Sequence, residues 1–489
     1  MAIETELKLS LSLRAASQLN DHPLLRGIEP QKHRLVSTYF DTPDNQLRSR
    51  RIVVRYRRKG NEWLLAVKTA GALSAGLAQR GEWETAGTPG EFDFSHVDDA
   101  SVRQAVEAAR DQLQAVFTTD FTRHAWLLTN QDGNRVELAL DRGWIVAQER
   151  RQRICEVELE LLSGSVGTLF GIVQQLQDAL LLHPEVRSKS ERAYALASNG
   201  PLVPVKATPV PLTRGLRTTD AFRMIAQSCL SHLQSNELGV CATEQPEFVH
   251  QARVGIRRLR SSIRLWEPLL PEDFVARFEP LWQDVASKLG DARNWDVFAS
   301  ETLVGLREVF GSRPELEKLA GYAGRRRLAC RRAARTLFKS ADYSRLLVDF
   351  GAALIALPEE GGKIEKFVPR CLAKRAKRVA ERAATAAGGD DAARHRLRVA
   401  FKQLRYALEF FAPIIDKSVF LNYHEAASVL QELLGRLNDL AVARQLVAEA
   451  LPAKQGQAIQ EGLERQAAVL LPEMNAVLDA FLKQTVSWD

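Results

Sequence analysis

The chain has 489 residues, of which 45% are hydrophobic and 26% are charged, and its formal net charge is +7. This length is too great for one typical domain and predicts two or three. No apolar run approaches the ~20 residues that a membrane-spanning helix requires. The lack of such a run excludes an integral helical membrane protein, and we expect no membrane partner.

The five cysteines show no paired spacing such as C-x-x-C, which indicates free thiols in a reducing compartment. The N-terminus lacks the apolar stretch of a secretory signal and begins at once with a strand-like pattern. We therefore expect a cytoplasmic protein.

Charged and apolar residues alternate at the start of the chain, where Glu4, Glu6 and Lys8 share one parity. A period of two is typical of a β-strand whose two faces meet different environments. Same-face neighbours lie ~6–7 Å apart along a strand, so two carboxylates there repel each other unless a cation lies between them. The pattern fits a divalent metal site with an amine ready for an anionic ligand, although the wet face of an ordinary antiparallel sheet gives the same alternation.

The same alternation recurs in five further segments, and their ionisable residues are largely sorted by sign onto different strands. A solvent face selected only for solubility would mix the signs, because like charges on one face cost energy. If these strands close with the charged parity inward, the interior becomes a polar tunnel in which acidic strands hold metal and basic strands hold phosphate oxygens. The ionisable residues are Arg55, Arg57, Glu62, Lys68, Arg80, Glu82, Glu84, Glu137, Asp141, Glu156, Glu158 and Glu160.

About the first two hundred residues resemble the CYTH domains, also called triphosphate tunnel metalloenzymes. The motifs that carry the resemblance follow in the family's order and are Glu4-x-Glu6-x-Lys8, Tyr39-Phe40-Asp41-Thr42-Pro43, Arg55-x-Arg57, Lys68, Arg80-x-Glu82-x-Glu84, Arg123, Asp141, Glu156-x-Glu158 and Ser188-Lys189. Arg123 stands alone where many relatives carry a pair of basic residues. The resemblance implies an eight-stranded antiparallel barrel that forms a tunnel, and metal-dependent attack on a triphosphate.

The resemblance also implies a role for each of these residues. A divalent ion, Mg²⁺ or Mn²⁺, is expected on Glu4, Glu6, Glu156 and Glu158, with Asp141 and Glu160 as supporting acids. The triphosphate oxygens are expected on Arg55, Arg57, Lys68, Arg80, Arg123 and Lys189. Lys8 is expected to orient the reacting end, and with Glu4 and Glu6 it forms the predicted catalytic set.

Residues 199–215 contain four prolines, which break both helix and strand. We predict a CYTH-like domain over residues 1–200, a Pro-rich linker over 201–215 and a helical domain over 216–489. Residues 1–205 hold 25 Lys and Arg against 26 Asp and Glu, whereas the remainder holds 42 against 34. All the excess positive charge lies in the second half, whose partner should be anionic.

The second half has a helical apolar period and contains an internal repeat. The segment 250–260 recurs at 395–405, an offset of 145, which predicts repeats of about 216–360 and 361–489. In each copy the basic residues fall at i, i+3, i+7 and i+10, which is one helix face. These rows are His250, Arg253, Arg257 and Arg260, and His395, Arg398, Lys402 and Arg405. Most basic stripes are solvated helix faces, but we expect these rows to lack the Glu at i+4 of an ordinary exposed helix.

This half resembles the CHAD domain, a duplicated helical bundle whose histidine and basic residues line a channel and which is linked to polyphosphate in relatives. The second copy departs from the family's acidic pattern, with Arg436 and Ala441 where the first copy has Asp291 and Asp296. The resemblance implies a polyphosphate partner. Nucleic acid is disfavoured, because the basic helices lack the aromatic platforms of single-strand binders.

These observations predict a multidomain protein. Its first domain, of the α+β class, is a barrel tunnel with flanking helices, and its second domain, of the all-α class, is a duplicated helical bundle. We predict a divalent-metal-dependent phosphoanhydride hydrolase that cleaves inorganic triphosphate to pyrophosphate and phosphate. Two alternatives stay open. One is a hydrolase or cyclase acting on an organic triphosphate, such as ATP or thiamine triphosphate, and the other is a non-enzymatic protein that binds polyphosphate or nucleic acid.

Overall fold

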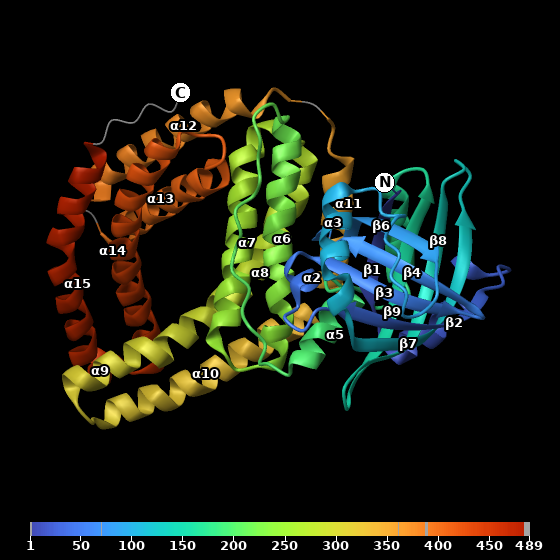
Figure 1. Ribbon diagram of the computed structural model, residues 1–489. Helices are drawn as coiled ribbons and strands as arrows, with labels where there is room; N and C mark the ends of the chain where they lie inside the picture. Colours follow the sequence, from blue (N-terminus) through green and yellow to red (C-terminus); the bar gives the residue numbers. More distant parts are fainter. Residues whose placement is uncertain (1, 70, 360, 387–389, 484–489) are drawn as a thin grey trace. The chain divides into compact units, whose positions relative to one another are not determined.

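The computed structural model describes residues 2–69, 71–359, 361–386 and 390–483, and it divides into two compact units (Figure 1). The first unit contains Met1–Val203 and Lys339–Ala356, and the second contains Pro204–Phe338 and Leu357–Asp489. None of the helices described combines enough length and apolar character to span a membrane. The five cysteines are free thiols.

The first unit is built on a closed antiparallel barrel of eight strands. Their order around the barrel is β1-β9-β8-β7-β2-β3-β4-β6, and β6 pairs back with β1. Two short strands, β5 and β10, extend this sheet. The strands are β1 (Ala2–Ser10), β2 (Gln31–Asp41), β3 (Ile52–Lys59), β4 (Glu62–Thr69), β5 (Ala72–Ser74), β6 (Leu77–Ala86), β7 (Gln114–Thr129), β8 (Arg135–Ala147), β9 (Arg150–Ser163) and β10 (His183–Pro184). The predicted eight-stranded barrel is confirmed.

The strand register directs the charged parity into the barrel. Directly opposite residues of an antiparallel pair share a face. Glu6 lies opposite Glu160, and Arg123 lies opposite Asp141. The barrel interior is therefore lined by the ionisable residues that the alternation singled out.

The opposite, apolar parity packs outward under helices. Phe170 of α4 packs with Leu7 and Leu159, and Val106 of α3 packs with Val54. The apolar residues are buried under helices on two sides of the barrel, which explains why the alternation is so regular. A shift of the strand register by one residue would place the charged residues in these apolar cores. The helices of this part are α1 (Leu13–Leu19), a 3₁₀ turn (Pro23–Leu25), α2 (Gln46–Ser49), α3 (Ala100–Ala109), a 3₁₀ turn (Arg110–Gln112), α4 (Val166–Gln177) and α5 (Lys189–Ser198).

One part of the barrel interior is apolar, and α5 packs against it. Ala193 and Tyr194 of α5 form a cluster with Phe121, Ile145 and other residues of the inward parity. The helix starts with a capping box between Ser188 and Glu191, which places Lys189 in its first turn. The polar interior therefore occupies only part of the predicted tunnel.

In the described residues of the second unit, all regular secondary structure is helical apart from an isolated bridge between Arg217 and Lys363, and the segment before α6 forms no helix. Helices α6, α7 and α8 pack in sequence, as do α12, α13 and α14, and α7 also packs on α13. The repeated basic motif lies on α7 and on α13, so the repeat corresponds to a duplicated helical bundle. The helices are α6 (Thr218–Ala242), α7 (Pro246–Trp266), a 3₁₀ turn (Glu267–Leu269), α8 (Glu272–Val297), a π turn (Phe298–Thr302), α9 (Leu303–Phe310), α10 (Pro314–Phe338), α12 (Ile364–Ala386), α13 (Asp391–Phe411), α14 (Lys417–Ala450) and α15 (Ala453–Leu482).

Helix α11 (Ala341–Ala356) lies in sequence between α10 and α12 but belongs to the barrel unit. The predicted first repeat, about 216–360, includes this helix. The domain boundaries at 200 and 216 stay a prediction, and the contiguous division that they imply does not account for α11.

Candidate functional site

Glu4 and Glu6 on β1 are held by basic residues from neighbouring strands. Arg80 lies opposite Glu4, its Nε donates to Glu4 at 2.8 Å, and its Nη2 lies 2.8 Å from Glu6 Oε1. Lys68 Nζ donates to Glu4 at 3.0 Å, and Lys8 Nζ lies 3.5 Å from Glu6 Oε1. Two predicted metal ligands therefore share one ion network with two residues that were predicted to bind the triphosphate, Lys68 and Arg80, and with Lys8, which was predicted to orient its reacting end.

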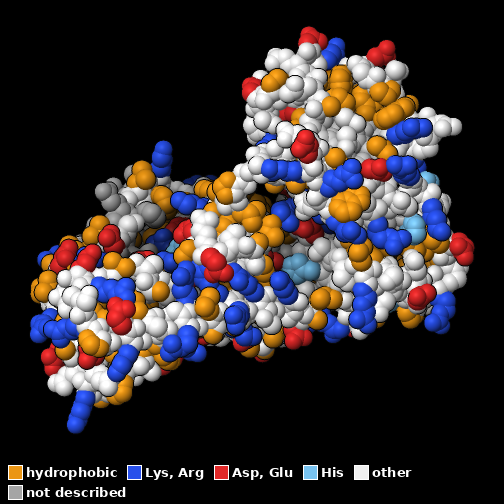
Figure 2. Space-filling view, turned by 90° about the horizontal axis from the view of Figure 1, so that it is seen from below, with side chains coloured by type: hydrophobic (Ala, Val, Ile, Leu, Met, Phe, Trp, Pro, Cys, Tyr) orange, Lys and Arg blue, Asp and Glu red, His pale blue; other side chains and the backbone are white. Residues whose placement is uncertain are grey.

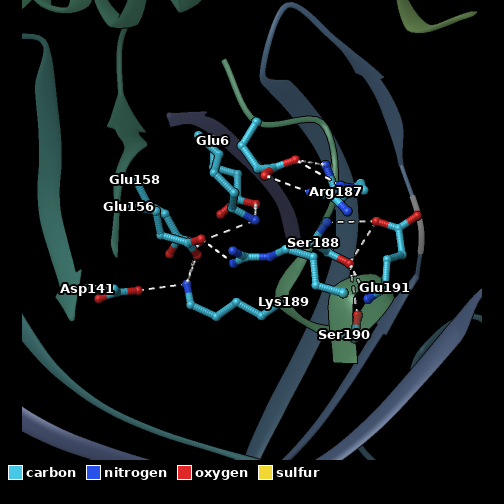
Figure 3. Close-up of polar contacts among 12 residues, drawn as sticks. Glu6, Asp141, Glu156, Glu158, Arg187, Ser188, Lys189, Ser190 and Glu191 are labelled. Carbon is cyan, nitrogen blue, oxygen red and sulfur yellow. Dashed lines mark hydrogen bonds and ion pairs between the residues drawn. The ribbon is translucent and has the colours of Figure 1, made fainter. Parts of the chain in front are cut away.

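Three other carboxylates form a buried cluster on β8 and β9. Asp141 lies opposite Glu156 in the ladder, and Glu158 follows on the same face. Each residue offers an oxygen atom, and these atoms all lie within 4.8 Å of one another. Lys189 reaches into the cluster, where its Nζ lies 2.7 Å from Asp141 Oδ2 and 2.9 Å from Glu158 Oε1 and also contacts Glu156 (Figure 3).

Two arginines complete the neutralisation of this cluster. Arg123 donates to both oxygens of Asp141 at 2.8 Å, and Arg192 pairs with Glu156. Burial raises the pKa of the Asp141 carboxyl, but Arg123 and Lys189 outweigh it and hold that pKa below its usual value. Arg192 was not predicted, although its position three residues after Lys189 puts both on one helix face.

The cluster of Asp141, Glu156 and Glu158 fits a hard divalent cation. Its ligand atoms are all carboxylate oxygens, the type that Mg²⁺ and Mn²⁺ prefer over imidazole or thiolate. Asp141, predicted as a supporting acid, lies at the centre of this group, whereas Glu4 and Glu6 lie among Lys68, Arg80 and Lys8. The assignment of metal ligands among these residues stays a prediction.

Glu160, the other predicted supporting acid, lies in a second acidic region. Burial and the neighbouring carboxylates of Glu4 and Glu137 raise the pKa of Glu160 to about 7. A carboxyl group with this pKa is partly protonated at neutral pH, so a cation placed nearby would favour its ionised form.

Arg57 differs from the other basic residues of the interior. Arg55 lies 3.3 Å from Glu82, but Arg57 has no carboxylate partner in the described part of the chain, and its Nε donates to Ser37 Oγ at 3.3 Å. Burial and the adjacent guanidinium of Arg55 lower the pKa of Arg57 to about 10. Two neighbouring guanidiniums, one of them without an anionic partner, are suited to bind phosphate oxygens.

Tyr39 is a further buried residue beside this arginine pair, and no role was predicted for it. It lies opposite Arg55 in the ladder and stacks on Phe117 with ring centroids 4.6 Å apart. Burial raises the pKa of its hydroxyl, but Arg55 and Arg57 outweigh it and lower the pKa to about 8. One signal for a role of Tyr39 was present in the sequence, because this residue begins the Tyr39-Phe40-Asp41-Thr42-Pro43 motif.

In the second unit the two basic rows meet between α7 and α13. Burial and the charges of Arg257 and Arg398 lower the pKa of Arg253 to about 10. Burial and the charges of Arg257, Arg398 and Arg253 lower the pKa of Lys402 to about 5. The two repeats therefore contribute to one shared cluster, which we call the cationic cluster and which consists of Arg253, Arg257, Arg398 and Lys402.

Several donors in and beside the cationic cluster lack partners. The guanidinium of Arg257 lies 5.4 Å from the ring centre of Tyr406, and that of Arg405 lies 5.0 Å from it. The Tyr406 hydroxyl and the Nε atoms of Arg257, Arg398 and Arg405 are buried without a hydrogen-bond partner among the described residues. Buried polar groups are normally satisfied, so these donors mark a place where an anion would be stabilised.

The outer members of the rows are engaged differently. Arg260 pairs with Glu279 at 2.8 Å, and Arg405 pairs with Glu409 at 2.7 Å. Glu409 follows Arg405 at i+4, so the expectation that the rows lack such a Glu is wrong at this end. His395 contacts Asn438 Oδ1 at 3.2 Å.

His250 is half-buried at the start of the α7 row. Burial and the charge of Arg293 lower its pKa. The imidazole therefore charges only at a lower pH than an exposed histidine does.

Asp296 explains one difference between the repeats. It is fully buried and binds Arg331 through both oxygens, at 2.9 and 3.0 Å, and Arg327 at 2.7 Å. This network ties α8 to the basic helix α10, and Ala441 in the second copy cannot form it. On the face of the molecule that Figure 2 shows, Lys and Arg side chains are interspersed with acidic ones.

Comparison with known proteins agrees with this geometry. Residues 2–194 match the CYTH domain family, and residues 224–448 match the CHAD domain family. The chain is thus a CYTH domain followed by a CHAD domain.

Three similar proteins each cover part of the chain. An inorganic triphosphatase from Haemophilus influenzae is 32% identical over 209 residues, which cover 40% of this chain and 56% of that protein. The chain therefore spans about half the length of this relative. The crystal structure of the CHAD domain from the plant Ricinus communis is 31% identical, with a TM-score of 0.50, and covers 59% of this chain and 99% of that one. A Hippeastrum protein with a dominant triphosphatase activity is 20% identical, with a TM-score of 0.31, and covers 41% of this chain and 98% of its own.

Proposed function

We propose that the protein hydrolyses inorganic triphosphate to pyrophosphate and phosphate inside the barrel, with Mg²⁺ or Mn²⁺ as cofactor. The observation that carries this proposal is the coexistence, in one barrel interior, of a carboxylate cluster and an arginine pair. A protein that only captured an anion would have no use for Asp141, Glu156 and Glu158 beside its cations. The name of the Haemophilus relative supports the same activity.

Some residues of the barrel would bind the substrate, and others would orient its reacting end. Arg55 and Arg57 would hold phosphate oxygens, while Lys8 and Arg123 would donate to the reacting end. Held by the carboxylate cluster, the divalent cation would neutralise phosphate charge and lower the pKa of water. In-line displacement at phosphorus needs mainly positioning and charge neutralisation, both of which these residues supply.

The CHAD domain is proposed to bind polyphosphate at the cationic cluster. A linear polyanion offers a row of oxygens to the unsatisfied donors around Tyr406. Its charge would relieve the mutual repulsion of Arg253, Arg257 and Arg398. A cytoplasmic location is part of this proposal, since free thiols suit a reducing compartment.

A substrate panel tests the proposed reaction. Phosphate release from inorganic triphosphate, ATP, thiamine triphosphate and pyrophosphate is measured with Mg²⁺ and with Mn²⁺. The proposal expects inorganic triphosphate to be cleaved fastest, and only when a divalent cation is added. Release from none of these compounds would contradict it.

A further inference from the structure

Helix α11 is a part of the barrel unit that the second half of the sequence supplies. The chain leaves this unit after Val203, returns to it at Lys339 and leaves again after Ala356. A helix that returns in this way must owe its place to its own contacts, because it is not adjacent in sequence to any barrel strand.

The apolar contacts of α11 join the core beneath α4. Val348 is fully buried in the same cluster as Leu7 and Phe170, with Ala352 and Ile355 packed against it. Close approach is required at Gly351. A Cβ atom there would lie 2.8 Å from Phe170 Cε1 and 3.0 Å from Ala75 Cβ, so a larger side chain would push α11 away from α4.

Polar contacts fix the helix at several points. Ser344 Oγ lies 2.9 Å from His183 Nδ1 on β10, and the ring of Tyr343 stacks on that of His183 at 6.0 Å. Along α4, Gln174 Nε2 donates to Asp349 Oδ1 at 2.7 Å. These contacts hold α11 against both α4 and β10.

The short strand β10 connects α11 to the proposed active site. His183 and Pro184 pair with Ser10 and Leu9 of β1, and the amide of Glu185 donates to the carbonyl of Lys8 at 2.9 Å. The amide of Lys8 in turn donates to the carbonyl of Gly76 at 2.9 Å.

The segment after β10 leads directly to the second amine of the site. Arg187 donates from its amide to Glu185 Oε1 at 3.0 Å, and Ser188 then caps the helix that begins with Lys189. Lys189 therefore follows β10 closely in sequence, whereas Lys8 is joined to the residue after β10 by a backbone hydrogen bond.

We propose that α11 is a positioning element of the barrel site, which the CHAD half of the sequence contributes to the CYTH unit. It holds β10, and through β10 it fixes the backbone of Lys8 and the start of α5. The effect of α11 on turnover rests on the proposed function. The effect of α11 on the backbone does not, because it can be measured without substrate. Residues 1–203 alone would then lack part of their own core.

The test compares two glycine substitutions in the full-length protein. Gly351→Leu forces α11 away from Phe170, whereas Gly171→Leu, on α4, places its side chain where nothing lies within 4 Å of the Cβ. Amide hydrogen exchange reports the opening of single hydrogen bonds. We expect Gly351→Leu to speed exchange at Lys8 and Glu185 by roughly tenfold or more, and to leave β3 and β4 as protected as in Gly171→Leu.

Turnover gives the second readout. Because misplacement of a positioned group by about 1 Å can cost 100-fold in rate, we expect Gly351→Leu to lower kcat for triphosphate by roughly 10- to 100-fold with a smaller change in KM. Ser344→Ala, which removes the contact with His183 and a hydrogen bond to the carbonyl of Ser340 within the same turn, should show the same pattern more weakly in a protein that folds normally.

The outcomes separate this inference from the proposed function. Faster exchange at Lys8 and Glu185 with a lower kcat supports α11 as a positioning element. If Gly351→Leu and Ser344→Ala match Gly171→Leu in both exchange and kcat, the inference is overturned while the proposed hydrolysis stands. If the parent protein cleaves no triphosphate, the proposed function fails. If exchange in Gly351→Leu still rises in that case, α11 only holds β10 in place, and its proposed role in turnover is overturned.

Discussion

Lys189 Nζ lies 2.7 Å from Asp141 Oδ2, and both side chains are almost completely shielded from solvent. The amine thus joins Arg123 and Arg192 in neutralising the three buried carboxylates of the cluster. A divalent cation bound to Asp141, Glu156 and Glu158 would take over this role and leave Lys189 to contact phosphate.

Removal of that amine should therefore make the fold depend on metal. Breaking a buried ion pair from one side costs about 3–5 kcal/mol, so Lys189→Met should lower the free energy of unfolding by about this amount in the presence of a chelator. Added Mg²⁺ should restore more stability to the variant than to the parent, because the cation replaces the missing charge. Denaturant unfolding with and without Mg²⁺ measures both effects.

Lys454→Met provides the control for this experiment, since Lys454 is an exposed residue of α15. It should unfold like the parent under both conditions. Equal gains from Mg²⁺ in Lys189→Met and in the parent would contradict a metal site at the carboxylate cluster.

Inorganic triphosphate should be a better substrate than ATP. Phosphate contacts are expected from Arg55, Arg57 and Arg123, and no feature of the sequence indicates a base-reading pocket beside them. We expect kcat/KM for triphosphate to exceed that for ATP by at least about 100-fold, since unused base contacts cannot contribute to transition-state binding. Similar values for the two substrates, or cyclic AMP among the products, would favour the organic-triphosphate alternative.

Polyphosphate binding should depend on the cationic cluster. Changing Arg253, Arg257, Arg398 and Lys402 together to Ala should weaken binding of long-chain polyphosphate by the full-length protein at least about tenfold, because contacts to phosphate and the release of counterions both disappear. The slope of log affinity against log salt should also become shallower. Hydrolysis of triphosphate should change little, and a fluorescence titration with a phosphate-release assay checks both.

The matched control removes the same number of basic residues from the surface of the same unit, two arginines and two lysines in place of the three arginines and one lysine of the cluster. Its four exposed residues are Arg325, Arg332, Lys374 and Lys377. This variant should keep most of the affinity. If both quadruple variants lose affinity to the same extent, binding follows net charge alone and the rows on α7 and α13 are only solvated helix faces.

Polyphosphate binding should take up protons through Lys402. Its pKa of about 5 in the ligand-free protein means that the amine is neutral at pH 7. An anion beside it raises that pKa, so the bound state holds more protons and affinity falls as pH rises between about 5 and the pKa of the complex. The guanidiniums cannot respond in this way, because arginine keeps its proton.

Calorimetry in buffers of different protonation enthalpy measures this uptake. The parent should take up a proton at pH 7, and Lys402→Met should take up correspondingly less. Lys402→Arg, which is charged throughout, should bind without that uptake. Equal uptake by all three proteins would show that Lys402 is already charged before the anion binds.

The barrel and its charged interior could be predicted because alternation is a local property. Glu4, Glu6 and Lys8 share a face in any strand, and burial of the other parity fixes the register. The repeat could be found for a similar reason, since the spacing from His250 to Arg260 recurs intact from His395.

Long-range relationships left no comparable signal in the sequence. Nothing in the pattern of α11 distinguishes its partner, Phe170 of α4, from a partner among the CHAD helices. The pairing of Arg80 with Glu4, and the meeting of Lys402 with Arg257, depend on which strands and helices become neighbours. Arg192 lay within reach of sequence reasoning, because it follows Lys189 by almost one helical turn.

Phosphate release from inorganic triphosphate by the full-length Glu4→Gln and Glu6→Gln variants tests the central claim most directly. Each change removes a charge from the barrel interior while keeping the shape of the side chain, and circular dichroism shows whether the fold is kept. With Mg²⁺ or Mn²⁺ present, we expect turnover to fall at least about 100-fold in both folded variants, as expected when charged groups that serve the metal or the transition state are lost. Turnover within a few-fold of the parent, in folded variants and at every metal concentration, would show that the reaction does not take place among these carboxylates.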